Sequence, residues 1–289
     1  MDFVTGVTGF IGRVLAMRLI AQGARVRSVV RNPGRARSLQ EAGLEVIKGD
    51  LRDPRFLPRA LEGVERVYHV AGVTKALEGR DYWEGNVQVT LLLAKAFANR
   101  GGRGRLVHVS SLAAAGPSLP GEPRTEEMAP APVSLYGRSK LRGEEAVTAL
   151  PEPHSWVVVR PPIVYGPGDR DVLLLFRAVR RGLVPMARPE QLCSLLYVHD
   201  LVNALLLCGR APEAHRRLYH LATPPDLTAA EMAAAAARAL DRRVRCLKVP
   251  AWTVRAACRL AHLGSLLRGR PGILSPDKGI EMVQPAWHC

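Results

Sequence analysis

The chain has 289 residues, of which 47% are hydrophobic, a composition typical of a globular protein with room for one domain and an added lobe. No uninterrupted apolar run is long enough to span a bilayer, which argues against a membrane-spanning segment. The formal net charge is +15, but the arginines are dispersed and only 5% of residues are aromatic. We therefore expect no specific nucleic-acid partner.

The five cysteines are odd in number and scattered through the C-terminal half of the chain. Their spacing fits neither a metal site nor a disulfide framework, so we expect reduced cysteines and no bound metal. No segment with a charged start and an apolar middle precedes the first predicted strand. We therefore expect a cytoplasmic protein.

Three glycines at three-residue intervals follow the first predicted strand, in the run from Val4 to Gly12. Gly6 can take a positive φ in a tight turn, Gly9 lets a diphosphate approach the backbone, and Gly12 lets the next helix pack closely. That helix offers free N–H groups to phosphate at its N-terminus. We predict a βαβ unit, rather than a glycine turn without ligand, whose dinucleotide contacts are Gly6, Thr8, Gly9, Phe10, Ile11 and Gly12.

The end of the second predicted strand, residues 25–30, bears on the choice of cofactor. An acid there would bind the adenosine ribose and repel a 2′-phosphate, whereas an arginine would bind that phosphate. No acid lies between Gly23 and Gln40, and Arg31 stands at the strand end, followed by Arg35. We therefore expect NADP(H) to be favoured over NAD(H), with Arg31 as the phosphate ligand; the alternative is that both are ordinary surface arginines.

A later predicted strand, within residues 65–72, runs out through small residues. Ala71 and Gly72 allow the chain to pass close to a ribose-diphosphate, and Val70 belongs to the same strand end. We expect all three to contact the cofactor.

The predicted strand within residues 105–111 alternates β-branched residues and ends at Ser110 and Ser111. Ligands bind at this carboxyl edge in open parallel sheets. A Pro-rich, acidic loop over residues 113–135 follows, and we expect it to contact the substrate or close over it.

Tyr136 and Lys140 are four residues apart in a predicted helix, so both side chains lie on one face, one turn apart. A tyrosine with its ordinary pKa near 10 is a poor base at neutral pH, and we expect the nearby ammonium to lower that pKa. The phenol would then exchange a proton with a carbonyl/alcohol pair while hydride moves to or from a nicotinamide. The alternative is a buried tyrosine in an ordinary amphipathic helix.

The glycine turn, the strand-end serine and the Tyr136/Lys140 pair, in this order, resemble the extended short-chain dehydrogenase/reductase superfamily, that is, the NAD-dependent epimerase/dehydratase family. The run from Arg160 to Asp169 is similar to a motif of that family. The resemblance implies that Ser111 holds the substrate oxygen, that Tyr136 is the acid/base, and that Lys140 reaches the nicotinamide ribose. Further implied cofactor contacts are Asp50 and Leu51 at the adenine and Pro161 and Ile163 at the nicotinamide carboxamide.

Two departures from the family pattern narrow the expected chemistry. The sugar-nucleotide dehydratases have an Asp-Glu pair where this chain has Leu112 and Ala113, and the epimerases usually have Asn where Ile163 stands. The chain instead resembles the dihydroflavonol reductase and 3β-hydroxysteroid dehydrogenase branch. We therefore expect an NAD(P)-dependent oxidoreductase acting on a ketone or secondary alcohol of a small, largely apolar substrate.

Two other functions stay open. One is a nucleotide-sugar epimerase that reduces and reoxidises its cofactor within one turnover. The other is an NADP-binding regulatory protein without turnover, although a pure binder needs no acid/base pair.

The expected fold is a Rossmann-type α/β domain with a doubly wound parallel sheet over residues 1–160. A smaller, interwoven substrate lobe is expected over residues 161–289, with segments near 190–225 returning to the sheet. The resemblance implies a homodimer formed through helices 81–100 and 136–150. The basic amphipathic helix predicted over residues 250–270 either covers the substrate pocket or contacts a membrane surface.

Overall fold

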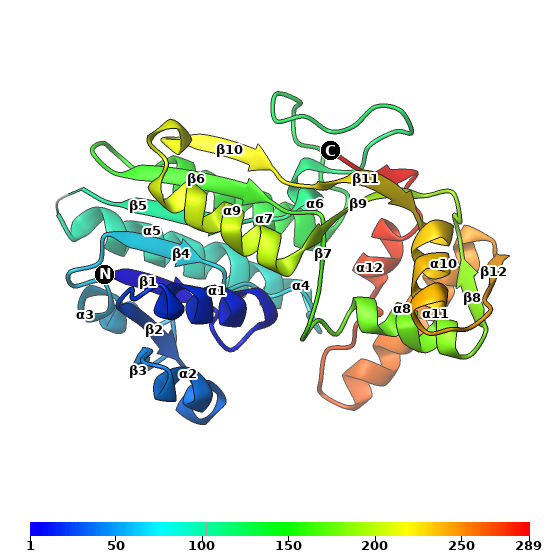
Figure 1. The fold of residues 1–289 in the computed structure, drawn as a ribbon, viewed down its shortest axis with the longest axis horizontal. Helices are drawn as coiled ribbons and strands as arrows, with labels where there is room; N and C mark the ends of the chain where they lie inside the picture. Colours follow the sequence, from blue (N-terminus) through cyan, green and yellow to red (C-terminus); the bar gives the residue numbers. More distant parts are fainter. Residues whose placement is uncertain (102) are drawn as a thin grey trace.

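Seven parallel strands form the central sheet, in the order β10-β6-β5-β4-β1-β2-β3 (Figure 1). The computed structural model describes residues 1–101 and 103–289. The strand order reverses at β1, so a crevice opens beyond the carboxyl ends of β1 and β4. The predicted Rossmann-type doubly wound sheet is therefore confirmed. Its strands are β1 (Asp2–Thr5), β2 (Val26–Val30), β3 (Glu45–Lys48), β4 (Arg66–His69), β5 (Arg105–Val109), β6 (Ser155–Arg160) and β10 (Arg217–His220).

Successive residues of β1 point to opposite faces of the sheet, as the strand period requires. Phe3 lies in one hydrophobic core with Leu93 and Phe97, whereas Val4 lies in the other with Leu15 and Leu201. Each core is closed by its own layer of helices. These are α3 (Leu57–Ala60), α5 (Val89–Asn99) and α7 (Leu135–Thr148) on the first face, and α1 (Phe10–Ala21), α2 (Arg37–Glu41) and α9 (Val198–Arg210) on the second.

A smaller lobe lies beside the carboxyl end of the sheet, on the right in Figure 1. It has its own core around Val179, Val184 and Ala236. The chain leaves this lobe to add β10 to the large sheet and then returns to it. Its elements are β7 (Ile163–Tyr165), α8 (Val172–Arg180), β8 (Leu183–Met186), β9 (Leu192–Tyr197), β11 (Thr223–Thr228), α10 (Ala229–Ala239), β12 (Arg245–Lys248), α11 (Ala251–Leu267), α12 (Pro276–Glu281) and β13 (Ala286–Trp287).

Short helical turns complete the described chain: α6 (Leu112–Ala115) and three 3₁₀ turns at 33–36, 54–56 and 212–214. Within residues 1–101 and 103–289, every helix is too short or too polar to cross a bilayer.

The helix predicted over residues 81–100 is not one regular α-helix. It begins as α4 (Gly79–Tyr82), widens into a π-helical segment over Trp83–Gln88, and continues as α5. The hydroxyl of Thr90, in the first turn of α5, donates to the carbonyl of Asn86 in the widened segment at 2.6 Å. The Asn86 amide in turn exchanges two hydrogen bonds with the backbone of Val73, at 2.7 and 2.9 Å. Side-chain hydrogen bonds therefore hold a helix geometry that the apolar pattern does not reveal.

The loop over residues 113–135 does not close over the crevice as expected. Ser118 donates its backbone N–H to Ala286 at 3.0 Å, and Arg124 donates its backbone N–H to His288 at 2.9 Å. The loop therefore lies along the C-terminal end of the chain, at the top of Figure 1. Long-range backbone pairing decides this position, and loop composition does not predict it.

A buried ion pair joins helix α7 to strand β6. Arg160 contacts both carboxylate oxygens of Glu144, at 2.9 and 2.6 Å, and both side chains are almost fully buried. The hydroxyl of Ser110 donates to the same carboxylate. Every partner of the Glu144 charge therefore comes from a neighbouring strand or strand end.

Replacing Arg160 by methionine should leave the Glu144 carboxylate buried without its counter-charge. We expect Arg160→Met to lower the free energy of unfolding by about 3–5 kcal/mol. The matched control is Arg142→Met, which removes a largely exposed partner of Glu145 on the same helix and should cost less than about 1 kcal/mol. Urea unfolding followed by circular dichroism measures both, and equal losses would contradict the prediction.

Candidate active site

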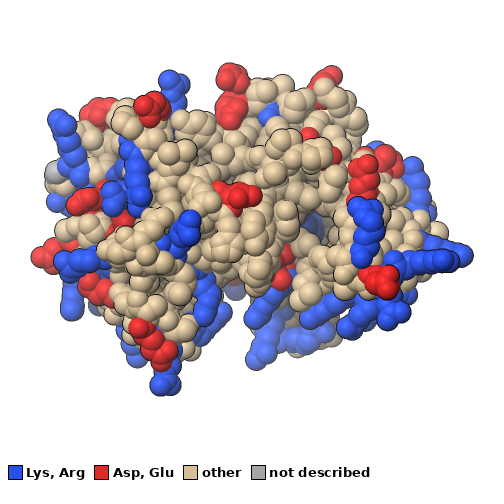
Figure 2. Space-filling view, in the orientation of Figure 1, with Lys and Arg blue, Asp and Glu red and all other residues tan. Residues whose placement is uncertain are grey.

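One cavity of about 1620 Å³ lies between the sheet and the smaller lobe, at the carboxyl ends of the strands. Figure 2 shows the molecule hollowed between its two halves, with Lys and Arg side chains on both sides of the lower opening. Every residue that the sequence predicts for the site lines this one cavity. They are Gly6, Thr8, Gly9, Phe10, Ile11, Gly12, Arg31, Asp50, Leu51, Val70, Ala71, Gly72, Ser111, Tyr136, Lys140, Pro161 and Ile163.

The glycine turn leaves no space for side chains. Gly6 has a φ of +74°, and a Cβ there would lie 2.8 Å from the backbone nitrogen of Ala71. A Cβ on Gly12 would lie 2.3 Å from the carbonyl oxygen of Gly6. Gly9 begins helix α1 in an extended conformation, and no side chain of the described chain caps this helix. The turn is therefore a backbone-lined cradle at a helix N-terminus, which fits a diphosphate.

The loop after β4 is held in place by a buried hydrogen-bond relay. Thr5 Oγ1 accepts from the N–H groups of Val70 and Ala71, at 3.1 and 2.9 Å. The Thr5 hydroxyl therefore donates its own hydrogen bond to His69 Nδ1 at 2.8 Å. His69 then carries its proton on Nε2 and donates from that atom to Thr90 Oγ1 at 2.9 Å. Burial lowers the pKa of His69 to about 3, so this ring is neutral. His69 thus holds Thr5, and through Thr5 the backbone of Val70 and Ala71 in the cavity wall.

Charged groups gather where an adenosine ribose would lie. Arg31 and Arg35 line the cavity beyond β2, and Asp50 lines it beyond β3. Arg52 donates to the Asp50 carboxylate with Nε and Nη2, the shortest contact being 2.7 Å. This bonding, with a smaller contribution from Arg31, lowers the pKa of Asp50. The carboxylate expected to accept from adenine is thus already bound by an arginine that the sequence analysis did not single out.

The two serines after β5 face different partners. Ser110 is buried and donates to Glu144, as described above. Ser111 lines the cavity together with Tyr136, begins α6 by accepting from Ala113 N at 3.2 Å, and its hydroxyl acts to lower the pKa of Tyr136. The geometry therefore brings Ser111, and not Ser110, to the tyrosine.

The pKa of Tyr136 departs from the expectation. Burial raises the pKa of Tyr136 to about 12, and the hydrogen bond with Ser111 only partly opposes this. Lys140 is not among the groups that lower it; the Lys140 ammonium donates to the carbonyl of Val109 at 2.7 Å, and burial lowers the pKa of Lys140 itself to about 8. The expectation that Lys140 lowers the tyrosine pKa is therefore wrong for the protein alone. Desolvation, which the four-residue spacing does not reveal, outweighs the effect of the nearby charge.

The smaller lobe holds the first turn of the helix that carries Tyr136. Asp277 of α12 accepts from the backbone N–H groups of Leu135 and Tyr136, at 2.6 and 3.0 Å. Glu281 accepts from the hydroxyl of Ser134, the residue that caps this helix, at 2.8 Å. These carboxylates were missed because they lie more than 140 residues from the groups that they bind. The only signal in the sequence is that a buried helix start needs acceptors for its free N–H groups.

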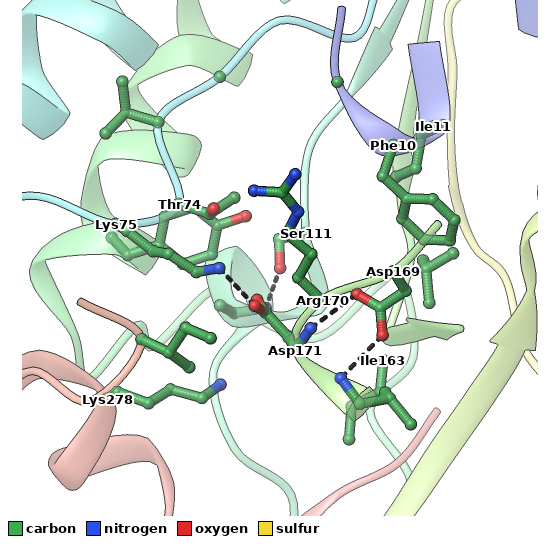
Figure 3. Close-up of a pocket in the computed structure, with 18 of the residues that line it drawn as sticks. Phe10, Ile11, Thr74, Lys75, Ser111, Ile163, Asp169, Arg170, Asp171 and Lys278 are labelled. Atoms are coloured by element: carbon green, nitrogen blue, oxygen red, sulfur yellow. Dashed lines mark hydrogen bonds and ion pairs between the residues drawn. The ribbon is translucent and has the colours of Figure 1, made fainter. Parts of the chain in front are cut away.

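A second charged cluster crosses the cavity between the lobes (Figure 3). Lys75, in the loop after β4, pairs with Asp171 at the start of α8, and Lys278 points toward the same carboxylate. Burial works against the charge of Lys278, but Glu281 at 3.0 Å and then Asp171 raise its pKa. Arg170 lines the cavity beside them. None of these four charged residues was predicted from the sequence to belong to the site.

Beyond this cluster the cavity becomes apolar. Its walls come from α8, β8, α10, α11 and the segment before α12. The apolar side chains among them include Leu174, Leu175, Val184, Met186, Met232, Val254, Ile273 and Leu274. Residues 114–135 contribute none of the lining. This part of the cavity wall is therefore built by the smaller lobe, which also contributes the polar side chains of Arg188 and Gln191.

The geometry defines a cavity with a backbone-lined glycine cradle and with Ser111 and Tyr136 in its wall, and comparison with known proteins identifies the family. The model of the NAD dependent epimerase/dehydratase family matches residues 3–222. The chain belongs to this family, and it is an NAD(P)-dependent enzyme of the extended short-chain dehydrogenase/reductase type.

Its relatives include both reductases and epimerases. The chain is 33% identical to a ceramide reductase of Caulobacter vibrioides, over 98% of this chain and 84% of the relative. It is 29% identical to a UDP-glucose 4-epimerase of Vibrio cholerae, over 95% and 86% of the two chains. The structure of MoeE5 in complex with UDP-glucose and NAD is similar with a TM-score of 0.74 and 27% identity, over 86% of this chain and 85% of that one.

The lowered pKa of Lys140 predicts how stability changes with pH. Its pKa is 10.5 in the unfolded chain and about 8 in the folded one, so between these values the unfolded chain binds more protons. Stability should therefore rise from pH 8 to pH 9, with a slope of up to about 1.4 kcal/mol per pH unit from this group. The interval stops at 9 because burial raises the pKa of Cys193 and of Cys289 from 9.0 to about 11, and these thiols act in the opposite direction above pH 9.

Urea unfolding of the cofactor-free protein across this interval measures the slope. Lys140→Met should remove the contribution of this group, whereas Lys95→Met, at an exposed position on α5, should keep it. An unchanged slope in Lys140→Met would show that Lys140 keeps an ordinary pKa in the folded protein.

Proposed function

We propose that this enzyme is an NADP-preferring reductase that acts on the ketone, or in reverse the secondary alcohol, of a largely apolar substrate. The observation that carries the proposal is the position of the Ser111–Tyr136 pair, between the backbone cradle for a dinucleotide and the apolar walls of the smaller lobe. A carbonyl at this pair would have its hydrocarbon part against the lobe.

The cavity fits a nicotinamide dinucleotide. The cradle of Gly6, Gly9 and Gly12 would hold the diphosphate, and Val70, Ala71 and Gly72 would pass along the ribose. Leu51 would lie at the adenine, and Pro161 and Ile163 at the nicotinamide. Bound NADP(H) supplies or accepts the hydride.

The chain's own groups would handle the oxygen and the proton. Ser111 would hold the carbonyl oxygen by a hydrogen bond, and Tyr136 would donate its proton to that oxygen as the carbon is reduced. Tyr136 carries its proton at neutral pH, as an ordinary phenol also does, so it can donate in this direction. Lys140 would bind the nicotinamide ribose and place a positive charge beside the phenol, and Asp277 would position Tyr136 through its backbone N–H.

Arginines support the preference for NADP. Arg31 and Arg35 line the cavity at the end of β2, where NAD-specific proteins have an acid for the ribose hydroxyls. The Asp50 carboxylate is bound by Arg52, which also contacts Glu84 at 3.6 Å, so these acids have a cation between them. The surroundings of a 2′-phosphate would therefore be positive.

The relative named ceramide reductase supports a lipid-like ketone as the substrate class. The second candidate, a nucleotide-sugar epimerase, is favoured by the relative named UDP-glucose 4-epimerase and by the likeness to MoeE5 with UDP-glucose. The apolar lining of the lobe favours the reductase. An epimerase would convert a UDP-sugar without net consumption of cofactor, whereas a reductase consumes NADPH as the ketone disappears.

Arg31→Asp should convert a favourable contact with the 2′-phosphate into a repulsive one. We expect the Kd for NADPH to rise by about 10- to 100-fold, as for the loss of a charge-assisted hydrogen bond, with little change for NADH. Arg18→Asp, on the exposed surface of α1, is the matched control. Fluorescence titration measures both, and tighter binding of NADH than of NADPH by the natural chain would overturn the preference.

Tyr136→Phe should remove the proton donor and leave the cofactor cradle intact. We expect kcat for NADPH-dependent reduction of a long-chain ketone to fall by roughly 10²- to 10⁴-fold, with a Kd for NADPH close to that of the natural chain. Tyr219→Phe, in β10 and outside the cavity lining, is the control.

The same assay separates the candidate functions when UDP-glucose is offered in parallel. Conversion of UDP-glucose without loss of NADPH would establish the epimerase. Full activity of Tyr136→Phe with either substrate would contradict the catalytic role of the tyrosine.

A further inference from the structure

Helix α11 presents an apolar stripe to solvent. Trp252, Leu260, Leu263 and Leu267 follow one another at intervals of eight, three and four residues, which places them on one face of the helix. Trp252 is 70% exposed, Leu260 69% and Leu267 90%. Side chains of this size are rarely left so exposed together, and such a stripe marks an interaction surface.

The stripe is bordered by unpaired positive charge. Arg255 lies three residues after Trp252, and Arg259 lies one residue before Leu260. Both arginines are exposed and flank the stripe on the same helix. In the described part of the chain, neither has a carboxylate within 4.0 Å. Residues 238–270 contain nine Lys or Arg and a single acid, Asp241. Figure 2 shows Lys and Arg gathered along the lower edge of this lobe.

The opposite face of α11 is part of the enzyme. Val254, Ala257 and Cys258 line the cavity, so this helix separates the apolar substrate space from solvent. Cys258 also packs on Gly279 of α12, where a Cβ would lie 3.1 Å away. The same α12 carries the two carboxylates that hold the start of α7. The exposed stripe thus lies one helix away from the reacting tyrosine.

We propose that α11 docks the protein onto an anionic lipid bilayer. The apolar stripe would enter the boundary between headgroups and acyl chains, and the flanking arginines would contact lipid phosphates and other anionic headgroups. The charge excess favours an anionic surface over a second copy of this chain, whose own α11 would bring like charges together. Docking in this orientation would place the apolar cavity directly behind the membrane-facing helix.

Vesicle co-sedimentation of the full chain tests the docking. The probes are vesicles of phosphatidylcholine alone and of phosphatidylcholine with phosphatidylglycerol. We expect binding to the anionic vesicles that weakens with added salt, and little binding to the neutral ones. The assay needs neither cofactor nor substrate, so its outcome is independent of the proposed reaction.

Two sets of variants assign the binding to α11. The pair Arg255→Gln and Arg259→Gln should weaken the partition coefficient by roughly 30-fold, as expected for two charges near an anionic surface. High salt screens the arginines, so the binding that the natural chain keeps at high salt should come from the apolar stripe. The pair Trp252→Ala and Leu267→Ala should abolish most of that binding. The control pair is Arg18→Gln and Leu207→Ala, which replaces an exposed arginine of α1 and an exposed leucine of α9 and should bind like the natural chain.

Three outcomes would overturn the docking. One is absence of binding to anionic vesicles at low salt, and another is equal binding by the α11 variants and the control. The third is a concentration-dependent dimer, seen by analytical ultracentrifugation without vesicles, that Trp252→Ala and Leu267→Ala disrupt. That result would make the stripe an interface between copies of this chain. A protein that binds vesicles as expected but reduces no ketone would uphold the docking and contradict only the proposed reaction.

Discussion

The position of Tyr136 in the site depends on how the start of helix α7 is held. A helix that begins inside a protein must find acceptors for its first N–H groups, and here the smaller lobe provides them. Asp277 accepts from the backbone of Leu135 and Tyr136, and Glu281 binds the capping residue Ser134. The smaller lobe, which forms one wall of the cavity, therefore also sets the position of Tyr136.

The other end of the site is built from backbone alone. Gly6 brings the turn after β1 against Ala71 after β4, and Gly12 brings helix α1 against Gly6. These close approaches expose peptide N–H groups to the cavity, where they can bind a diphosphate. The cavity thus contains a backbone cradle, the charged cluster of Lys75, Asp171 and Lys278, and apolar side chains of the smaller lobe.

Burial shifts the pKa values of both Tyr136 and Lys140. It raises the pKa of Tyr136 to about 12 and lowers the pKa of Lys140 to about 8, so both groups keep their protons at neutral pH.

The sequence by itself determined the local features of this protein. Glycine spacing, strand-end serines and the Tyr136/Lys140 interval predict the Rossmann-type sheet and residues that meet in one cavity, because each depends on neighbours within a few positions. Only the tertiary structure decided the rest: the π-helical segment around Asn86, the loop 113–135 lying along the chain end, the pKa of Tyr136 and the hold of Asp277 on α7. Each of these depends on burial or on partners distant in the chain, and local spacing carries no information about either.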